Sequence, residues 1–256
     1  MFEHGPNTMA MDVAFWSLGL TNPDYPLDQL GALSLDISGK FRALAIMQLL
    51  TESSTDLFLH NLMRSGRARL SYLDRLAKAG VSDDHHQVNG RYQPLLDAIA
   101  AASWDDARRI TQNVPAQFRP RHEYEDDYCY AKLLAGLIAV PAASEIELSL
   151  LLDRFDAWLD GQLDARWFVC RALTQRDQAE FDAAFEDVLL AHELAIDAAR
   201  ARSEHEDDRV LAERMVSIEG LALLRIATLR GLSTAPDYRY CPALARVPMR
   251  HPFPPL

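Results

Sequence analysis

Cysteine is scarce in this sequence, and its arrangement excludes two common structural frameworks. The 256 residues include only Cys129, Cys170 and Cys241, which lie far apart and form no CxxC pair. An odd number of widely separated cysteines argues against a disulfide framework and against a zinc ribbon. The first 39 residues contain no Lys or Arg, so they lack the positively charged start of a signal peptide. We therefore expect a cytoplasmic protein with reduced thiols.

Long apolar runs and an excess of positive charge are also lacking. The apolar stretch at residues 135–143 is short and contains Pro141, whereas a membrane span needs roughly 20 apolar residues. Lys and Arg number 26 and Asp and Glu number 37, which gives a formal net charge of −11. An acidic surface repels phosphate groups, so we expect no direct binding to nucleic acid or to an anionic membrane. The charge favours a basic protein as the partner, because opposite charges accelerate encounter.

The motifs of several enzyme classes are missing as well. The sequence has no glycine-rich phosphate loop, no GxSxG elbow, no HxxxH pair for a zinc peptidase and no ExxH pair for a di-iron site. Asp83, Asp84, His85 and His86 are consecutive and are candidate metal ligands, but four successive side chains do not naturally converge on one ion. We interpret them as a solvated turn, and we expect no metal, no cofactor and no enzyme activity.

The pattern that is abundant is helical. Ala and Leu are frequent, glycines number 11, and extended runs of β-branched residues are missing, which predicts an all-α fold. We expect two helices between residues 27 and 79, with a break near Ser53 and Ser54, and further helices up to about residue 229. Short connections predict an irregular multi-helix bundle or a short stack of antiparallel helical hairpins. We expect residues 1–256 to form a single domain.

Capping residues, glycine and proline indicate where elements begin, end or pack closely. Ser144 and Glu147 have the spacing of a capping box, and Thr174 and Asp177 resemble a second N-cap pair. Gly220 within the last long helix indicates close packing there. Prolines lead us to expect an irregular N-terminal segment at residues 1–25 and an extended C-terminal tail at residues 236–256, laid on the helices through its aromatic side chains.

Two acidic clusters are candidates for a binding surface. The first places tyrosines among acids, and aromatic anchors combined with steering charges are typical of protein interfaces. One interpretation is a docking patch for a basic protein. The alternatives are two solvated faces, with Tyr128 and Tyr130 pointing into the core. The candidate partner-binding residues are Glu123, Tyr124, Glu125, Asp126, Asp127, Tyr128, Glu204, Glu206, Asp207 and Asp208.

Several segments together resemble one bacterial protein family. They are LDAI at residues 96–99, WDDAR at 104–108, EYEDDYCYA at 123–131, CRAL at 170–173, FDAAF at 181–185 and YCP at 240–242. From about Gly39 to the C-terminal tail, the chain resembles the immunity protein 49 family of polymorphic toxin systems. The resemblance implies an α-helical protein that is encoded beside a secreted toxin, often of a type VI or contact-dependent system, and inhibits it by direct binding. It transfers no catalytic residues.

The identity of the toxin is a separate hypothesis. Nuclease toxins are common targets of such proteins and tend to be basic, because their active sites attract phosphate, and the charge of −11 fits a basic partner. We therefore expect a nuclease toxin. A helical-repeat scaffold with another protein partner is the main alternative, and an enzyme without a recognised motif is the third. The choice between a monomer and a homodimer stays open.

Overall fold

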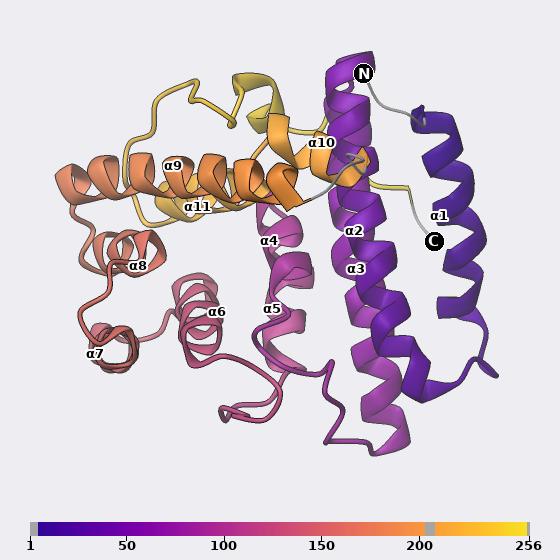
Figure 1. The fold of residues 1–256 in the computed structure, drawn as a ribbon, viewed down its shortest axis with the longest axis horizontal. Helices are drawn as coiled ribbons and strands as arrows, with labels where there is room; N and C mark the ends of the chain where they lie inside the picture. The colour runs from indigo at the N-terminus through magenta and orange to yellow at the C-terminus, as the bar shows by residue number, and fades with distance from the viewer. Residues whose placement is uncertain (1–4, 203–207, 255–256) are drawn as a thin grey trace.

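The computed structural model describes residues 5–202 and 208–254, and these residues fold almost entirely into helices (Figure 1). Within this part of the chain the β-structure is limited to an isolated bridge between Tyr238 and Cys241. The predicted all-α fold is confirmed. The elements are α1 Pro6–Thr21, α2 Leu27–Glu52, α3 Thr55–Ala79, α4 Gln93–Ala100, α5 Trp104–Gln112, α6 Glu125–Ile138, α7 Glu145–Leu159, α8 Ala165–Gln175, α9 Gln178–Arg202, α10 Asp208–Met215, α11 Ile218–Leu229 and the 3-10 helix η1 Ala243–Arg246.

Helices α2 and α3 form a long antiparallel hairpin. The predicted break lies where expected, because Ser53 adopts a left-handed conformation with φ of 52° and ends α2. Ser54 then begins α3 by accepting a hydrogen bond from the backbone N–H of Leu57, which satisfies one of the free donors of the first turn. Figure 1 shows α1 on the outer side of this hairpin and the remaining helices on its other side. The hairpin therefore separates α1 from the remaining helices.

Helices α4 and α5 connect the hairpin to the second half of the molecule. In Figure 1, α6, α7 and α8 are seen nearly end-on, whereas α9 and α11 run across them. Buried side chains from both halves belong to one hydrophobic cluster, and its fully buried members include Ile46, Phe58, Leu134, Phe155 and Leu223. Burial of this apolar surface is the main force that holds the helices together.

A buried ion pair joins α2 to α4. The Nε atom of Arg42 lies 2.7 Å from Oδ1 of Asp97, and the hydroxyl of Ser65 in α3 donates to the other carboxylate oxygen at 2.5 Å. Only 1% of the Asp97 side chain is exposed. Burial disfavours the charged form of Arg42, but Asp97 and Glu213 outweigh burial and raise the pKa of the guanidinium group. Arg42 therefore stays charged although it is buried, and its carboxylate partners compensate for the cost of burying that charge.

Two expectations about helix starts are wrong. Residues 1–25 are not irregular, since α1 occupies most of them. Pro6 stands in the first turn of α1, where its missing N–H has no helical partner in any case, and Pro23 follows the end of the helix. Thr174 does not cap α9, because it lies within α8 and its hydroxyl donates to the carbonyl of Cys170. Asp177 takes that role by accepting from the backbone N–H of Glu180 at 3.0 Å.

The chain after α11 is not extended throughout, because it contains the bridge and η1. The ring of Tyr238 packs edge-on against Phe185 at 5.0 Å between centroids. A Cβ atom on Gly220 would lie 2.6 Å from Sγ of Cys241, so the absence of a side chain lets this segment approach α11. The close packing expected at Gly220 is confirmed. Further on, the backbone N–H of Arg250 donates to Asp56, which brings the end of the chain back to α3.

All three cysteine side chains are buried and free. Burial raises the pKa of the Cys129 thiol to about 11 and that of Cys241 to about 12. The pKa of Cys170 is raised for the same reason. These thiols are therefore protonated at neutral pH.

Between residues 5 and 202 and between 208 and 254, no helix combines the length and the apolar character that crossing a membrane requires.

Candidate functional site

The first acidic cluster lies at the start of α6. Tyr124 is the N-cap residue, and Glu125, Asp126 and Asp127 form the first helical turn. Carboxylates are stabilised at this position, because the helix dipole and the unpaired N–H groups make the N-terminus positive. The local sequence thus explains both where α6 begins and why its acidic side chains spread around that end.

Glu125 is paired with an arginine from the next helix. Its Oε1 atom lies 2.7 Å from Nε of Arg154 in α7. The same guanidinium group stacks over the ring of Tyr128, 4.8 Å from its centroid. The arginine therefore binds the acidic start of α6 and covers the aromatic ring beneath it.

Asp126 and Asp127 share a second arginine, Arg166 in α8. Their distances to the guanidinium nitrogens are 2.7 and 2.8 Å, and Asp164 makes a third contact at 2.7 Å. Burial opposes the charge of Arg166, but the hydrogen bonds to Asp164 and Asp127 outweigh burial and raise its pKa. The hydroxyl of Tyr92 accepts a further hydrogen bond from Arg166 at 3.2 Å. Arg166 consequently fixes α6, α8 and the start of α4 relative to one another.

Glu123 and the three tyrosines of this cluster differ strongly in exposure. Glu123 is half-buried and accepts hydrogen bonds from the backbone N–H groups of Gly90 and Arg119, while burial raises the pKa of its carboxyl group. Tyr124 is 74% exposed, whereas Tyr128 is 5% and Tyr130 is 0% exposed. The interpretation that places Tyr128 and Tyr130 in the core is correct. Tyr124 is the aromatic side chain of this cluster that a partner can reach.

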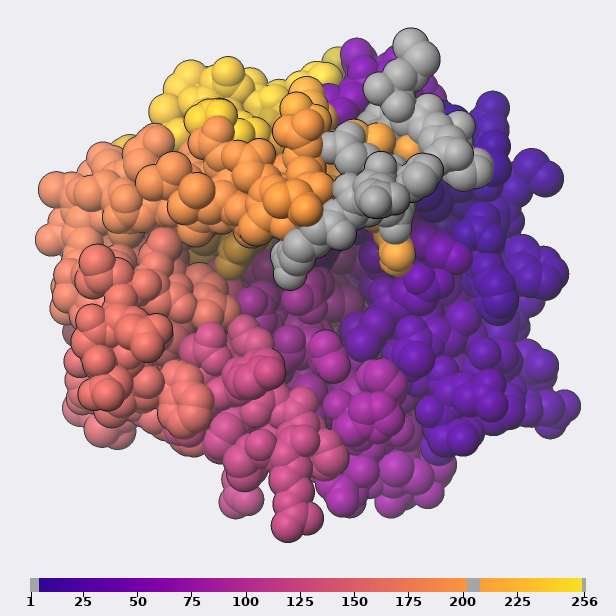
Figure 2. All heavy atoms as spheres, viewed as in Figure 1, coloured from indigo at the N-terminus to yellow at the C-terminus, as the bar shows by residue number. Residues whose placement is uncertain are grey.

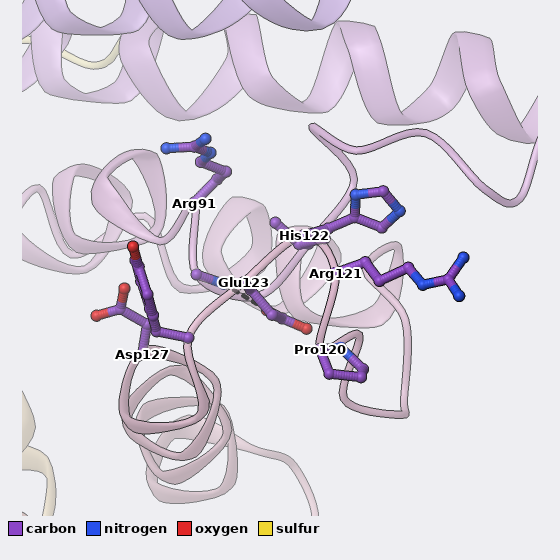
Figure 3. A pocket seen from close by; sticks show the side chains of 9 residues that line it. Arg91, Pro120, Arg121, His122, Glu123 and Asp127 are labelled. Carbon is purple, nitrogen blue, oxygen red and sulfur yellow. Dashed lines mark hydrogen bonds between the residues drawn. The ribbon is translucent and has the colours of Figure 1, made fainter.

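A pocket of about 340 Å³ opens beside Tyr124 (Figure 3). Glu123 lies between Arg91 and Arg121, whose guanidinium groups point in different directions away from it. Among the described residues neither arginine has an ion-pair partner. Glu123 and Asp127 are held by internal hydrogen bonds. The charged side chains of the pocket lining that have no such partner are therefore the two arginines, which are positive. The lining is formed by Val88, Gly90, Arg91, Pro120, Arg121, His122, Glu123, Tyr124 and Asp127.

A second pocket of about 360 Å³ is lined by Arg166 and by residues of α9 and α11. Its polar wall includes Glu219, whose pKa is raised by burial and whose Oε1 atom is buried without a hydrogen-bond partner among the described residues. His192 faces the same pocket, and its Nε2 atom lies 3.0 Å from the carbonyl oxygen of Glu213. Burial lowers the pKa of His192, so this ring is uncharged at neutral pH. The lining of this pocket contains no Ser, Thr, Cys or Lys side chain.

The consecutive residues 83–86 form a loop. The carboxylate of Asp84 accepts a hydrogen bond from the hydroxyl of Tyr72 at 2.7 Å and another from the backbone N–H of His86 at 2.7 Å. Nowhere in the described part of the chain do three or more His, Cys, Asp or Glu side chains converge in a way that could hold a metal ion. The structure therefore assigns Asp84 to loop hydrogen bonding.

The second acidic cluster is only partly visible. Glu204, Glu206 and Asp207 lie outside the described residues. Asp208 is the first residue of α10 and is 5% exposed.

Sequence reasoning missed Arg154 and Arg166. Their acidic partners are 29 and about 40 residues away along the chain, so no local spacing links them. The density of acids could have indicated that cationic partners are needed. Four carboxylates at one helix start repel one another unless cations lie nearby.

Comparison with known protein families identifies one match. The model of the family described as immunity protein 49 matches residues 43–245, which covers the chain from the middle of α2 to η1. No curated protein and no solved structure matches the chain. The matched region contains both pockets, both arginines and the whole start of α6. The match covers well over half of the sequence, and the chain therefore belongs to the immunity protein 49 family.

Proposed function

We propose that this protein binds a cognate antibacterial toxin, neutralises it by direct contact and catalyses no reaction. The observation that carries the proposal is the family match over residues 43–245, because the family name denotes an immunity protein. The geometry is compatible with a binding role. The start of α6 offers an exposed aromatic side chain beside a pocket, on a framework held by two arginines.

We place the toxin-binding surface at the start of α6, with Tyr124 as its anchor. Glu123, Glu125, Asp126 and Asp127 surround it. Four carboxylates, those of Glu125, Asp126, Asp127 and Asp164, contact the guanidinium groups of Arg154 and Arg166. The formal net charge of −11 of the whole chain favours a basic partner. Tyr128 supports the surface from below. We propose that the acids of the second cluster, Glu204, Glu206, Asp207 and Asp208, add to the attraction at longer range.

We further propose that the toxin is a basic nuclease-type effector delivered by a type VI or related system, and that inhibition takes place in the cytoplasm. The support is the formal charge of −11, since a nuclease must attract phosphate and an acidic inhibitor matches its field. Electrostatic steering of this kind accelerates encounter without adding contacts, so it is compatible with internally paired acids.

The direct test is co-expression with the toxin gene encoded beside the gene for this protein. Cells that carry both are expected to survive, whereas cells that carry the toxin alone die, and a tagged copy of the protein is expected to retain the toxin on a column. A toxin that stays lethal and unbound in the presence of the folded protein overturns the proposed function.

The proposed surface has a matched pair of variants. Tyr124 and Val140 are both 74% exposed, and they lie at opposite ends of α6. Tyr124→Ala is expected to weaken toxin binding at least tenfold, because exposed aromatic anchors dominate interface energies. Val140→Ala is expected to change Kd less than twofold. Equal Kd values for the two variants would leave the immunity function standing but remove this surface from it.

A further inference from the structure

The second pocket has an apolar wall that a partner molecule can reach. Val188, Ala191 and Ala195 line it from one face of α9, and Leu163 lines it from the loop before α8. Leu163 is 86% exposed, and Ala191 and Ala195 are exposed as well. Figure 2 shows α8 and most of α9 at the surface of one face of the molecule, with a hollow between α9 and α6. This wall offers apolar contact to a group that enters from outside.

The polar end of the same pocket holds a carboxyl group without a counter-charge. Glu219 stands in the first turn of α11, and its Oε1 atom is buried with no hydrogen-bond partner within residues 5–202 and 208–254. The hydroxyl of Tyr130 is close enough to lower the pKa of this carboxyl group, but within the same residues it too is buried without a hydrogen-bond partner. A buried polar group that lacks a partner opposes folding, so Glu219 indicates a role other than holding the fold together.

The charges around this pocket select a cation. Among the lining residues that the structure describes, Arg166 is the one permanent cation, and it already contacts three carboxylates at 2.7 to 2.8 Å. His192 is uncharged at neutral pH, because burial lowers its pKa. A cation that enters the pocket would therefore meet an excess of negative charge and supply the counter-charge that Glu219 lacks. An anion would be repelled by the same carboxylates.

The chain segment that directly follows α9 cannot supply this cation. Residues 203–207 lie outside the described part of the chain, and their sequence is SEHED. It contains three acids and no Lys or Arg. A basic side chain from another molecule is therefore the occupant that the charges favour.

We propose that the second pocket receives the side chain of a lysine or arginine of the toxin, an assignment that rests on the proposed function. The alkyl stem of that side chain packs against α9, and its cationic end lies at Glu219. Long basic side chains bury their methylene groups on apolar surface and keep their charge at polar groups, so they fit a pocket with these two walls. Arg166 lines the pocket and also binds Asp126 and Asp127. The pocket and the start of α6 therefore form one continuous contact surface.

The first test uses two small probes, the full chain and no toxin. Nα-acetyl-lysine amide carries the cation, and Nα-acetyl-norleucine amide has a similar stem without it. The lysine probe is expected to bind with a Kd on the order of millimolar and to shift the backbone NMR signals of Ala191, Ala195 and Glu219. The norleucine probe is expected to bind at least tenfold more weakly.

Two matched variants show whether Glu219 causes this preference. Glu219→Gln is expected to abolish the preference for the lysine probe. Glu186→Gln makes the same change at an exposed residue of α9 outside the pocket lining, and it should keep the preference. The proposal is overturned if the wild-type chain binds both probes equally, if the shifts lie elsewhere, or if a basic side chain of the chain itself already fills the pocket and no probe binds.

The second test measures the Kd of the toxin. Ala195→Phe fills the pocket and leaves Glu219 in place, whereas Ala183→Phe adds the same ring at an exposed site of α9 outside the lining. Ala195→Phe and Glu219→Gln are each expected to weaken toxin binding at least tenfold, and Ala183→Phe less than twofold. Equal Kd values for all variants overturn the pocket assignment and leave the immunity function standing. A toxin that does not bind the wild-type chain overturns both.

Discussion

At the scale of single residues, Gly220 and Gly39 differ in whether the structure has room for the methyl group of alanine. A Cβ atom on Gly220 would meet Sγ of Cys241 at 2.6 Å, whereas one on Gly39 would meet only a terminal nitrogen of Arg209 at 3.7 Å. Gly220→Ala is expected to lower the free energy of unfolding by about 1–3 kcal/mol through overpacking. Gly39→Ala is expected to raise it by up to about 1 kcal/mol, because Ala favours the helix. Urea denaturation measures both. A Gly220→Ala protein as stable as Gly39→Ala would contradict the tight contact.

Replacing Asp97 is also expected to lower the free energy of unfolding. Removing its carboxylate leaves Arg42 as a buried charge without its closest partner. We expect Asp97→Ala to destabilise the protein by about 3–5 kcal/mol. The control is Asp105→Ala, whose side chain is 99% exposed and whose pair with Arg108 is on the surface, so its effect should stay below about 0.5 kcal/mol. Guanidinium denaturation distinguishes the two, and comparable losses would show that the buried pair has no special weight.

Glu219 links stability to pH. Burial raises the pKa of its carboxyl group above the ordinary value of 4.5, so the folded protein holds this proton at pH values where the unfolded chain has released it. Stability from this group is present below pH 4.5 and is lost as pH rises through the folded pKa, with a slope of at most about 1.4 kcal/mol per pH unit. Glu219→Gln removes the proton exchange. The variant is expected to gain stability relative to wild type as pH rises from 4.5 to 7, and two parallel curves would refute this account.

At the scale of elements, α7 shows how a helix start can be read from sequence. The hydroxyl of Ser144 accepts from the backbone N–H of Glu147, and the Glu147 carboxylate accepts from the backbone N–H of Ser144. We expect Ser144→Ala to cost about 1 kcal/mol and to accelerate hydrogen exchange in the first turn of α7. Ser149→Ala, at an exposed interior position of the same helix, should instead be neutral or slightly stabilising. Similar behaviour of both variants would argue against the cap.

Element boundaries were predictable where the signal is local. The break at Ser53 and Ser54 and the capping box at Ser144 depend on neighbouring residues, and both are found where expected. The sequence analysis does not predict α1, because it interprets the prolines of residues 1–25 as signs of an irregular segment, although proline is favoured in the first turn of a helix. Thr174 was misplaced because the same residue type can cap a helix or bond back to a carbonyl within one.

The candidate site was predictable only in outline. Its position at the start of α6 follows from the local density of acids and tyrosines. The pairing of these acids with Arg154 and Arg166 depends on helices that meet only in the folded chain, so it could not be derived from spacing. The exposure of Tyr124 and the burial of Tyr128 likewise follow from which face of α6 meets α7 and α8.

At the scale of the whole molecule, the formal net charge of −11 affects how fast a charged partner binds. For the proposed basic toxin, the association rate constant is expected to fall several-fold as salt rises from low to physiological concentration, because the ions screen attraction. Stopped-flow mixing at several salt concentrations measures this rate constant. A rate constant that does not change with salt would contradict the proposed basic partner.

The burial of the three cysteines has a practical consequence. Alkylating reagents attack the thiolate, and a thiol that is both enclosed and protonated reacts with them slowly. In the native chain Cys129, Cys170 and Cys241 should thus be silent towards iodoacetamide at neutral pH and become reactive as each region opens. Mass spectrometry of the labelled peptides would then measure the rate at which α6, α8 and the C-terminal segment each unfold. No probe has to be added to the protein.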